Sequence, residues 1–182
     1  QTVGHGLSQA PGMIICKNRD RSYNWDIYHS GTGNVEETLI FTTAATRNVD
    51  AFTTTAPTST VFGTKNTYTH NGTDDYIAYC FHSVSGYSDI GSYTGNGSAS
   101  GPTVTTGFKP AFVLIKSSTA ATGWAIVDNT RSPTNPTTKT LFPELSNAEY
   151  TSTSSSDHYV DLNSNGFQIK NTNSRFNANG ET

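Results

Sequence analysis

A segment near the N-terminus of this 182-residue chain is repeated 99 residues later. The run 10–17 (APGMIICK) has a counterpart in 109–116 (KPAFVLIK), in which the proline and the final lysine keep their places. Trp25 and Trp124 are separated by the same 99 residues. Two anchors at one offset indicate an internal repeat, and a repeat constrains the fold before any local pattern does.

A second pair of matching residues defines how far the repeat extends. Asn71-Gly72 corresponds to Asn179-Gly180 at an offset of 108, so the second copy is expected to contain extra loop residues. The sequence therefore predicts a first β repeat over 1–84, a Gly/Ser/Tyr-rich connector over 85–103 and a second β repeat over 104–182.

The residue pattern between these anchors is typical of β-structure. Short apolar runs are bounded by Gly, Pro, Asn and Asp, and the helical period is nearly absent. We expect an all-β fold, a β-sandwich with jelly-roll character built from two tandem repeats. Helical turns are expected only in 56–60 and 143–150. The expected strands are 12–17, 23–28, 38–42, 59–62, 75–82, 112–116, 124–127, 140–142, 159–162 and 167–170.

The second repeat lacks its final strand. In the first copy the apolar run 75–82 follows the Asn-Gly turn, whereas the second copy stops at Thr182. A strand absent from one of two equivalent places leaves an unpaired sheet edge, which proteins normally avoid. We expect the gene product to continue with residues rich in Tyr, Ile, Ala and Phe, or a neighbouring chain to complete the sheet by strand addition.

The charge pattern argues against two classes of partner. The net charge is −3 without a basic stripe, so the electrostatic footprint of nucleic-acid binding is missing. No apolar run approaches transmembrane length, and no membrane insertion is expected. Charged residues make up only 14% of the chain, which favours burial of part of its surface against another protein. Cys16 and Cys80 are expected to be buried thiols, with a disulfide between them as the alternative.

The residues of common catalytic sites do not form their usual patterns. Asp74 and Asp75 are adjacent and point to opposite faces of a strand, whereas a glycosidase needs two converging carboxylates. Glu144 and Glu149 are five residues apart, a spacing that does not place them on one helical face. No Gly-x-Ser-x-Gly nucleophile motif is present. We therefore predict no enzymatic activity.

Metal and cofactor motifs are equally weak. Asn71, Asp74 and Asp75 are the best oxygen ligands for calcium, but the simpler interpretation is a hairpin turn. Cys80 and His82 share a strand face without a second pair of zinc ligands. We predict neither a resident metal nor a cofactor.

Six residues are candidates for binding a sugar, because aromatic faces beside hydrogen-bonding side chains suit such ligands. Equivalent repeat positions make both tryptophans better candidates for the core, and the Asp/Arg pair can form a local ion pair. The two tyrosines lie in the Gly-rich connector, where exposure is expected. The six are Trp25, Tyr87, Tyr93, Trp124, Asp128 and Arg131.

Several of these runs resemble a known family. The runs 107–116 (GFKPAFVLIK), 123–128 (GWAIVD), 164–167 (SNGF) and 177–180 (NANG) resemble the repeat of tail-fibre and other virion proteins of tailed bacteriophages, marine and cyanophage-like phages included. The block 87–97 (YSDIGSYTGNG) is similar to the inter-repeat signature of that family. The resemblance covers nearly all of the chain. It implies a concanavalin-like or jelly-roll β-sandwich in an external phage structural protein, located in the virion. It implies no activity.

Two functions follow as hypotheses. The first is a structural virion component, part of a tail fibre, tail or capsid decoration, whose partners are other virion proteins and copies of itself, with a trimer favoured. The second is a lectin-like module that recognises glycans of the host surface; a glycan depolymerase is a weaker third. The fold alone does not choose among them.

Overall fold

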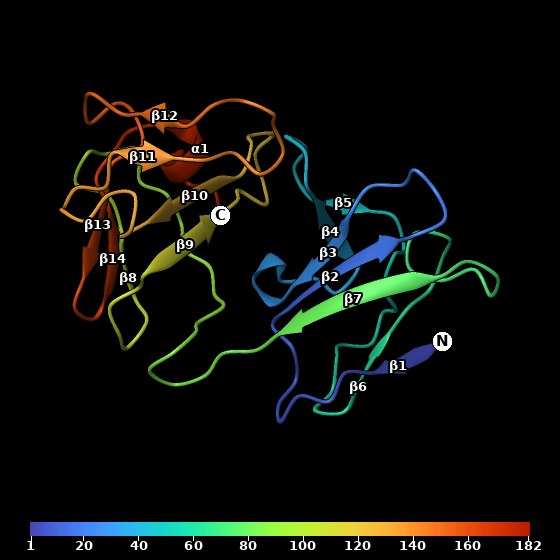
Figure 1. Ribbon diagram of the computed structural model, residues 1–182. Coiled ribbons are helices and arrows are strands. Elements are labelled where there is room, and N and C mark those ends of the chain that lie inside the picture. Colours follow the sequence, from blue (N-terminus) through green and yellow to red (C-terminus); the bar gives the residue numbers. More distant parts are fainter. The chain divides into compact units, whose positions relative to one another are not determined.

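The computed structural model describes residues 1–182 and consists almost entirely of antiparallel β-strands and loops (Figure 1). Its helical segments are the 3-10 turn η1 (Ser30–Thr32) and the short α-helix α1 (Ser174–Asn177). Neither has the length or the apolar character required to cross a bilayer. The prediction of an all-β protein is confirmed.

The chain divides into two compact units. Unit 1 comprises residues 1–41, 46–84 and 88–92, and unit 2 comprises residues 42–45, 85–87 and 93–182. Each unit has a hydrophobic core of its own. The expected connector, 85–103, is therefore divided between them, with 88–92 packed in unit 1 and the residues from 93 onward packed in unit 2.

Unit 1 is built on a five-stranded antiparallel sheet. Its order is β5 (Arg47–Asn48), β4 (Glu37–Ile40), β3 (Asp26–His29), β2 (Met13–Asn18) and β7 (Tyr76–Phe81). A separate pair joins β1 (Thr2–Gly4) to β6 (Val61–Gly63). Alternate residues of a strand face opposite sides, and both faces of this sheet bury apolar side chains. Ile27 and Leu39 are buried on one face, and the core of unit 1 lies on the other. The buried core residues are Ile14, Cys16, Tyr28, Ala51, Phe52 and Phe62.

Unit 2 contains three small antiparallel sheets. The first pairs β9 (Phe112–Ile115) with β10 (Ala125–Asp128). The second has the order β13 (Val160–Asn163), β14 (Gly166–Ile169) and β8 (Thr103–Thr105). The third pairs β11 (Lys139–Thr140) with β12 (Tyr150–Thr151). Its core residues are Val113, Ile115, Ala125, Val127, Val160, Leu162, Phe167, Ile169 and Phe176.

One pair of strands has the same register in both units. Every Cα pair of β9 and β10 is obtained from a pair of β2 and β3 by a shift of 99 residues, the offset of the sequence repeat. The turn after the first strand is also the same. Lys17 Nζ donates to the carbonyls of Asn18 and Arg21, and Lys116 Nζ donates to the carbonyls of Ser117 and Ala120. Similar local sequences thus form the same local structure.

The second half of the connector is fixed to unit 2 by its backbone. Gly95 and Gly180 are joined by a hydrogen bond of 2.9 Å, and Gly95 N–H also donates to Glu181 O. The buried side chain of Asn177 accepts from Asn96 N–H and donates to Ser98 O at 2.7 Å. A Cβ on Gly95 would lie 2.3 Å from Ala178 O, so only glycine allows this close approach.

Most local predictions agree with the structure. Each expected strand overlaps an observed one, and the strands not predicted, β1, β5, β8 and β12, are only two or three residues long. Of the two segments expected to contain a helical turn, 56–60 is an irregular loop, whereas 143–150 contains one turn, in which Leu145 N–H donates to Phe142 O at 3.1 Å. Cys16 and Cys80 are both free thiols, and the alternative of a disulfide is wrong. Cys16 is buried, whereas Cys80 is only partly so.

Candidate functional site

Strand β7 presents a different surface on each of its two faces. It lies at one edge of the five-stranded sheet, with β2 as its only neighbour there. Tyr76, Ala78 and Cys80 pack against the core of unit 1. The residues between them face the other side, because successive side chains of a strand alternate.

The outward-facing side chains of β7 form an apolar surface with one neighbour. Ile77, Tyr79 and Phe81 are 38%, 46% and 44% exposed. Trp25, which directly precedes β3, is 36% exposed, and its ring stacks on that of Tyr79 with centroids 6.4 Å apart and planes inclined by 30°. We call these four residues the β7 surface. Large apolar side chains exposed side by side on an edge strand favour association with another molecule.

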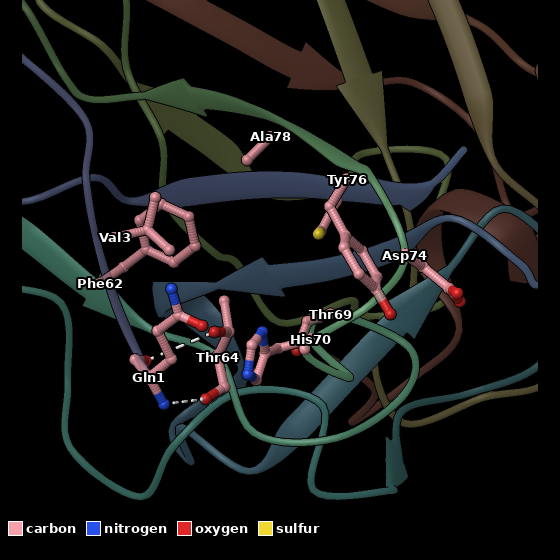
Figure 2. Close-up of a pocket in the computed structure, with 11 residues that line it drawn as sticks. Gln1, Val3, Phe62, Thr64, Thr69, His70, Asp74, Tyr76 and Ala78 are labelled. Atoms are coloured by element: carbon pink, nitrogen blue, oxygen red, sulfur yellow. Dashed lines mark hydrogen bonds between the residues drawn. The ribbon is translucent and has the colours of Figure 1, made fainter. Parts of the chain in front are cut away.

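The inward-facing side of β7 borders a pocket of about 360 Å³. Figure 2 shows Tyr76 and Ala78 of β7 lying opposite Val3 and Phe62, with Thr64 and His70 below them. The volume lies at the lower end of the range of ligand pockets, so the space suits a small group such as one sugar ring. The lining residues are Gln1, Val3, Cys16, Phe62, Thr64, Thr69, His70, Gly72, Asp74, Tyr76 and Ala78.

Two of the ionisable side chains that line the pocket, Asp74 and Cys16, have strongly shifted pKa values. Asp74 accepts hydrogen bonds from Arg21 Nε at 2.5 Å and Asn18 Nδ2 at 2.9 Å, which lower its pKa to about 2. Burial raises the pKa of the Cys16 thiol to about 12, so the thiol keeps its proton and is a poor nucleophile. This arrangement favours binding over covalent chemistry.

The residues considered for calcium are used in a turn instead. Asn71 Oδ1 accepts from the backbone N–H groups of Thr73 and Asp74. Asp74 pairs with Arg21, and Asp75 lies 3.6 Å from the guanidinium of Arg19. No group of three or more His, Cys, Asp and Glu side chains in the structure has the arrangement of a metal site.

Three of the predicted ligand-binding residues are engaged inside unit 2. Trp124 is 3% exposed, which confirms the core interpretation for this residue. Arg131 Nε pairs with Asp128 at 2.6 Å, as the local ion-pair interpretation expects. Arg131 also contacts Glu149 at 3.1 Å, so neither its charge nor that of Asp128 is free for a ligand.

The two connector tyrosines differ from each other. Tyr87 is 81% exposed, as expected, in the turn closed by the paired backbones of Val84 and Ser88. The expected exposure of Tyr93 is wrong. Its ring packs edge-to-face on Phe167 and its hydroxyl donates to Phe176 O at 2.7 Å. Burial raises the pKa of Tyr93 because the phenolate would lose its hydration.

Trp25 is the remaining candidate, and its exposure contradicts the prediction that it lies in the core. Its partners Ile77, Tyr79 and Phe81 were not among the candidate residues, because the run 75–82 was interpreted only as an apolar strand. A detectable signal was present. A strand with one solvated face alternates apolar and polar residues, whereas β7 is apolar at every position and so has a second apolar face.

Comparison with known proteins assigns the chain to a family, and the description of that family states no function. No curated protein and no solved structure matches it. A domain family of unknown function, DUF7483, matches residues 1–182. Because this match spans the whole chain, the protein belongs to the DUF7483 domain family.

Proposed function

We propose that this chain is a structural module of a bacteriophage virion, in a tail fibre, a tail or a capsid decoration, without catalytic activity of its own. The resemblance of its repeat to phage virion proteins supports the location. The module assembles with copies of itself and with other virion proteins, and a trimer is the favoured assembly.

The observation that carries the structural role is the β7 surface. Its members are between 36% and 46% exposed and lie on one face at a sheet edge. Burial of apolar area contributes roughly 25 cal/mol for each Å², so covering these side chains in an assembly is favourable. The low charge of the chain, 14%, is consistent with a surface that is shared with neighbours.

The proposal includes a finer description of the fold. We infer a β-sandwich of jelly-roll or concanavalin-like character that arose from two tandem repeats. The common register of β2–β3 and β9–β10 at a shift of 99 residues supports the duplication.

Self-association is the first test. The molar mass of the purified chain is measured by light scattering across concentrations up to about 100 μM, a range in which contacts of about 6 kcal/mol become visible. Wild type is expected to associate, and Tyr79→Thr and Phe81→Thr to weaken association without changing the fold. Tyr87→Thr is the matched control, because Tyr87 is exposed outside the β7 surface. A wild-type chain that stays monomeric, or association that survives both substitutions, would contradict the structural role.

The location needs a separate measurement. Mass spectrometry of density-purified particles, from a phage that encodes this chain, is expected to find it in a copy number that follows the particle's symmetry. Its absence from intact particles would overturn the virion assignment.

A second candidate function is binding of host-surface glycans, and the Trp25–Tyr79 pair favours it. Two stacked, partly exposed rings offer a flat apolar face of the kind on which sugar rings pack. The expected affinity is millimolar to micromolar, equivalent to about −4 to −8 kcal/mol.

Titration with bacterial surface polysaccharides distinguishes this function from the structural role. If glycans bind, Trp25 fluorescence changes on titration and Trp25→Ala loses the affinity, whereas Tyr87→Ala keeps it. If the β7 surface serves assembly alone, Trp25→Ala alters the molar mass and no polysaccharide changes the fluorescence.

A further inference from the structure

The pocket beside the inward face of β7 has two apolar walls. Phe62 of β6 and Val3 of β1 lie on one side of it, and Tyr76 and Ala78 of β7 lie on the other (Figure 2). All four residues belong to unit 1, so the pocket lies within one compact unit. Its volume of about 360 Å³ admits a ligand of about one ring. Apolar walls on two sides favour a ligand that has an apolar face.

The polar side chains around these walls are held in place by hydrogen bonds. Tyr76 Oη donates to Thr67 O at 2.9 Å and accepts from Asn18 Nδ2 at 3.0 Å. Asn18 is fully buried, and the hydroxyl of the buried Thr69 donates to Ala51 O. Because the lining is already ordered, a ligand that enters the pocket has less conformational entropy to offset.

One polar side chain of the pocket is available to a ligand. His70 is partly buried, and its imidazole makes no hydrogen bond within the protein. A neutral imidazole has one donor and one acceptor nitrogen, and a hydroxyl group can both donate and accept. The hydroxyls of Thr69 and Tyr76, by contrast, already donate to backbone carbonyls. The imidazole of His70 therefore suits a ligand that carries hydroxyl groups.

The charges at the pocket favour an uncharged ligand. The carboxylate of Asp74 accepts hydrogen bonds of 2.5 and 3.2 Å from Arg21, which balances its charge. No lysine or arginine side chain lines the pocket. A charged ligand would lose hydration there without finding an unpaired side chain of opposite charge. A pyranose sugar is uncharged and combines an apolar face with a hydroxylated edge, as this lining requires.

We propose that this pocket binds one uncharged pyranose unit, either a free monosaccharide or the terminal residue of a glycan. His70 is its hydrogen-bonding residue, and Phe62 and Tyr76 are its apolar contacts. None of the lining residues was among the six candidates for binding a sugar. The inference depends neither on the structural role nor on the Trp25–Tyr79 pair, because the pocket borders the opposite face of β7.

The test follows the backbone amides of the isotope-labelled chain by NMR during titration with the methyl glycosides of glucose, galactose and mannose. At least one is expected to shift the amides of 69–72 and 76–78 in a saturable manner at millimolar concentrations. Glucuronic acid and glucosamine, which carry a charge on the same ring, are expected to bind at least about tenfold more weakly. A polysaccharide that ends in the preferred sugar will compete if terminal residues enter the pocket and will not compete if the site takes the free sugar.

Two substitutions make the test specific to the pocket. His70→Ala is expected to weaken binding about three- to tenfold, because it removes a hydrogen bond between neutral groups. His82→Ala is its control, since His82 lies in the same unit outside the pocket. Ala78→Val fills part of the pocket and is expected to abolish the shifts, whereas Ile77→Val, on the opposite face of β7, is expected to preserve them.

Three results would overturn the proposal. One is the absence of shifts at the pocket amides with every neutral glycoside up to about 50 mM. Another is binding that both His70→Ala and Ala78→Val leave unchanged; if Ala78→Val does not fold, His70→Ala and its control decide. The third is a set of shifts centred on Trp25 and Tyr79, which would assign the sugar to the β7 surface. The molar mass of the chain tests the structural role separately.

Discussion

The two units contain the same pair of strands in different surroundings. β2–β3 and β9–β10 share their register and the lysine-bridged turn that follows the first strand. Yet Trp25 is partly exposed and Trp124 is buried. In unit 2, Glu144 accepts from Trp124 N–H at 3.0 Å and Arg175 donates to Trp124 O at 2.6 Å. The local sequence determines how the two strands of each pair are aligned. The segments that pack over each pair determine how exposed its tryptophan is.

The two units also differ in their buried ionisable side chains. Asp26 of β3 is fully buried and pairs with Arg47 at 2.5 Å, whereas the equivalent residue of β10 is Ala125. Unit 2 has instead a buried imidazole, His158, whose ring contacts Phe142, Tyr150 and Phe176. We therefore expect the contributions of Asp26 and His158 to stability to depend on pH in opposite directions.

The largest expected effect is the difference in unfolding free energy between alanine variants of the two tryptophans. Trp124→Ala should lower the free energy of unfolding by about 3–5 kcal/mol, because it leaves a cavity in a packed site. Trp25→Ala should lower it by less than about 1.5 kcal/mol, since it removes a partly exposed ring and one stacking contact. Chemical denaturation followed by circular dichroism measures both. Equal losses would show that the surroundings of the two rings are energetically alike.

The response of unit 2 to acid depends on His158. Burial, together with the nearby Arg175 charge, lowers the pKa of His158 to about 4. Its stabilising contribution is complete above the ordinary pKa of 6.5 and is lost as the pH falls toward 4. One pKa unit corresponds to about 1.4 kcal/mol, so the loss of stability approaches about 3 kcal/mol. His158→Phe should remove this slope from the exchange of the β13 and β14 amides; a slope that persists would assign it to another group.

The contribution of Asp26 in unit 1 has the opposite pH dependence. Burial raises the pKa of Asp26 to about 6, although the Arg47 charge acts against it. Asp26 therefore contributes most below its ordinary pKa of 3.8, and this contribution of about 3 kcal/mol is lost as the pH rises through 6. Asp26→Asn should abolish the trend in the β3 and β4 amides between pH 4 and pH 7. If those amides instead become better protected as the pH rises in wild type, the predicted direction of the pH dependence is wrong.

The smallest expected effect distinguishes the connector tyrosines. Tyr93→Phe removes the hydroxyl that donates to Phe176 O and should cost about 1 kcal/mol. Tyr87→Phe should change the free energy of unfolding by less than about 0.5 kcal/mol, because that side chain is exposed. The same denaturation experiment compares them. A neutral Tyr93→Phe would mean that the hydrogen bond makes no net contribution.

The β-strands of both units were predictable because their cause is local. The run 12–17 forms β2 because apolar and β-branched residues fit a pleated, half-buried surface. Strands such as β5 and β12 were missed because they contain two residues each, and two residues are too few to show the alternation that identifies a strand. The candidate site was predictable only in part. Trp25 was named as a candidate, whereas Tyr79, its stacking partner, lay in a run that was interpreted only as an apolar strand.

By itself the sequence determined where strands and turns form, and it determined that 10–17 and 109–116 form the same kind of strand. Side-chain alternation and turn residues act over a few positions, so they can be detected in the chain. Only the tertiary structure decided that Tyr93 is partly buried against Phe167 while Tyr87 is exposed, and that Asp26 pairs with Arg47. These outcomes depend on contacts between residues far apart in the sequence, and burial is a property of the packed whole.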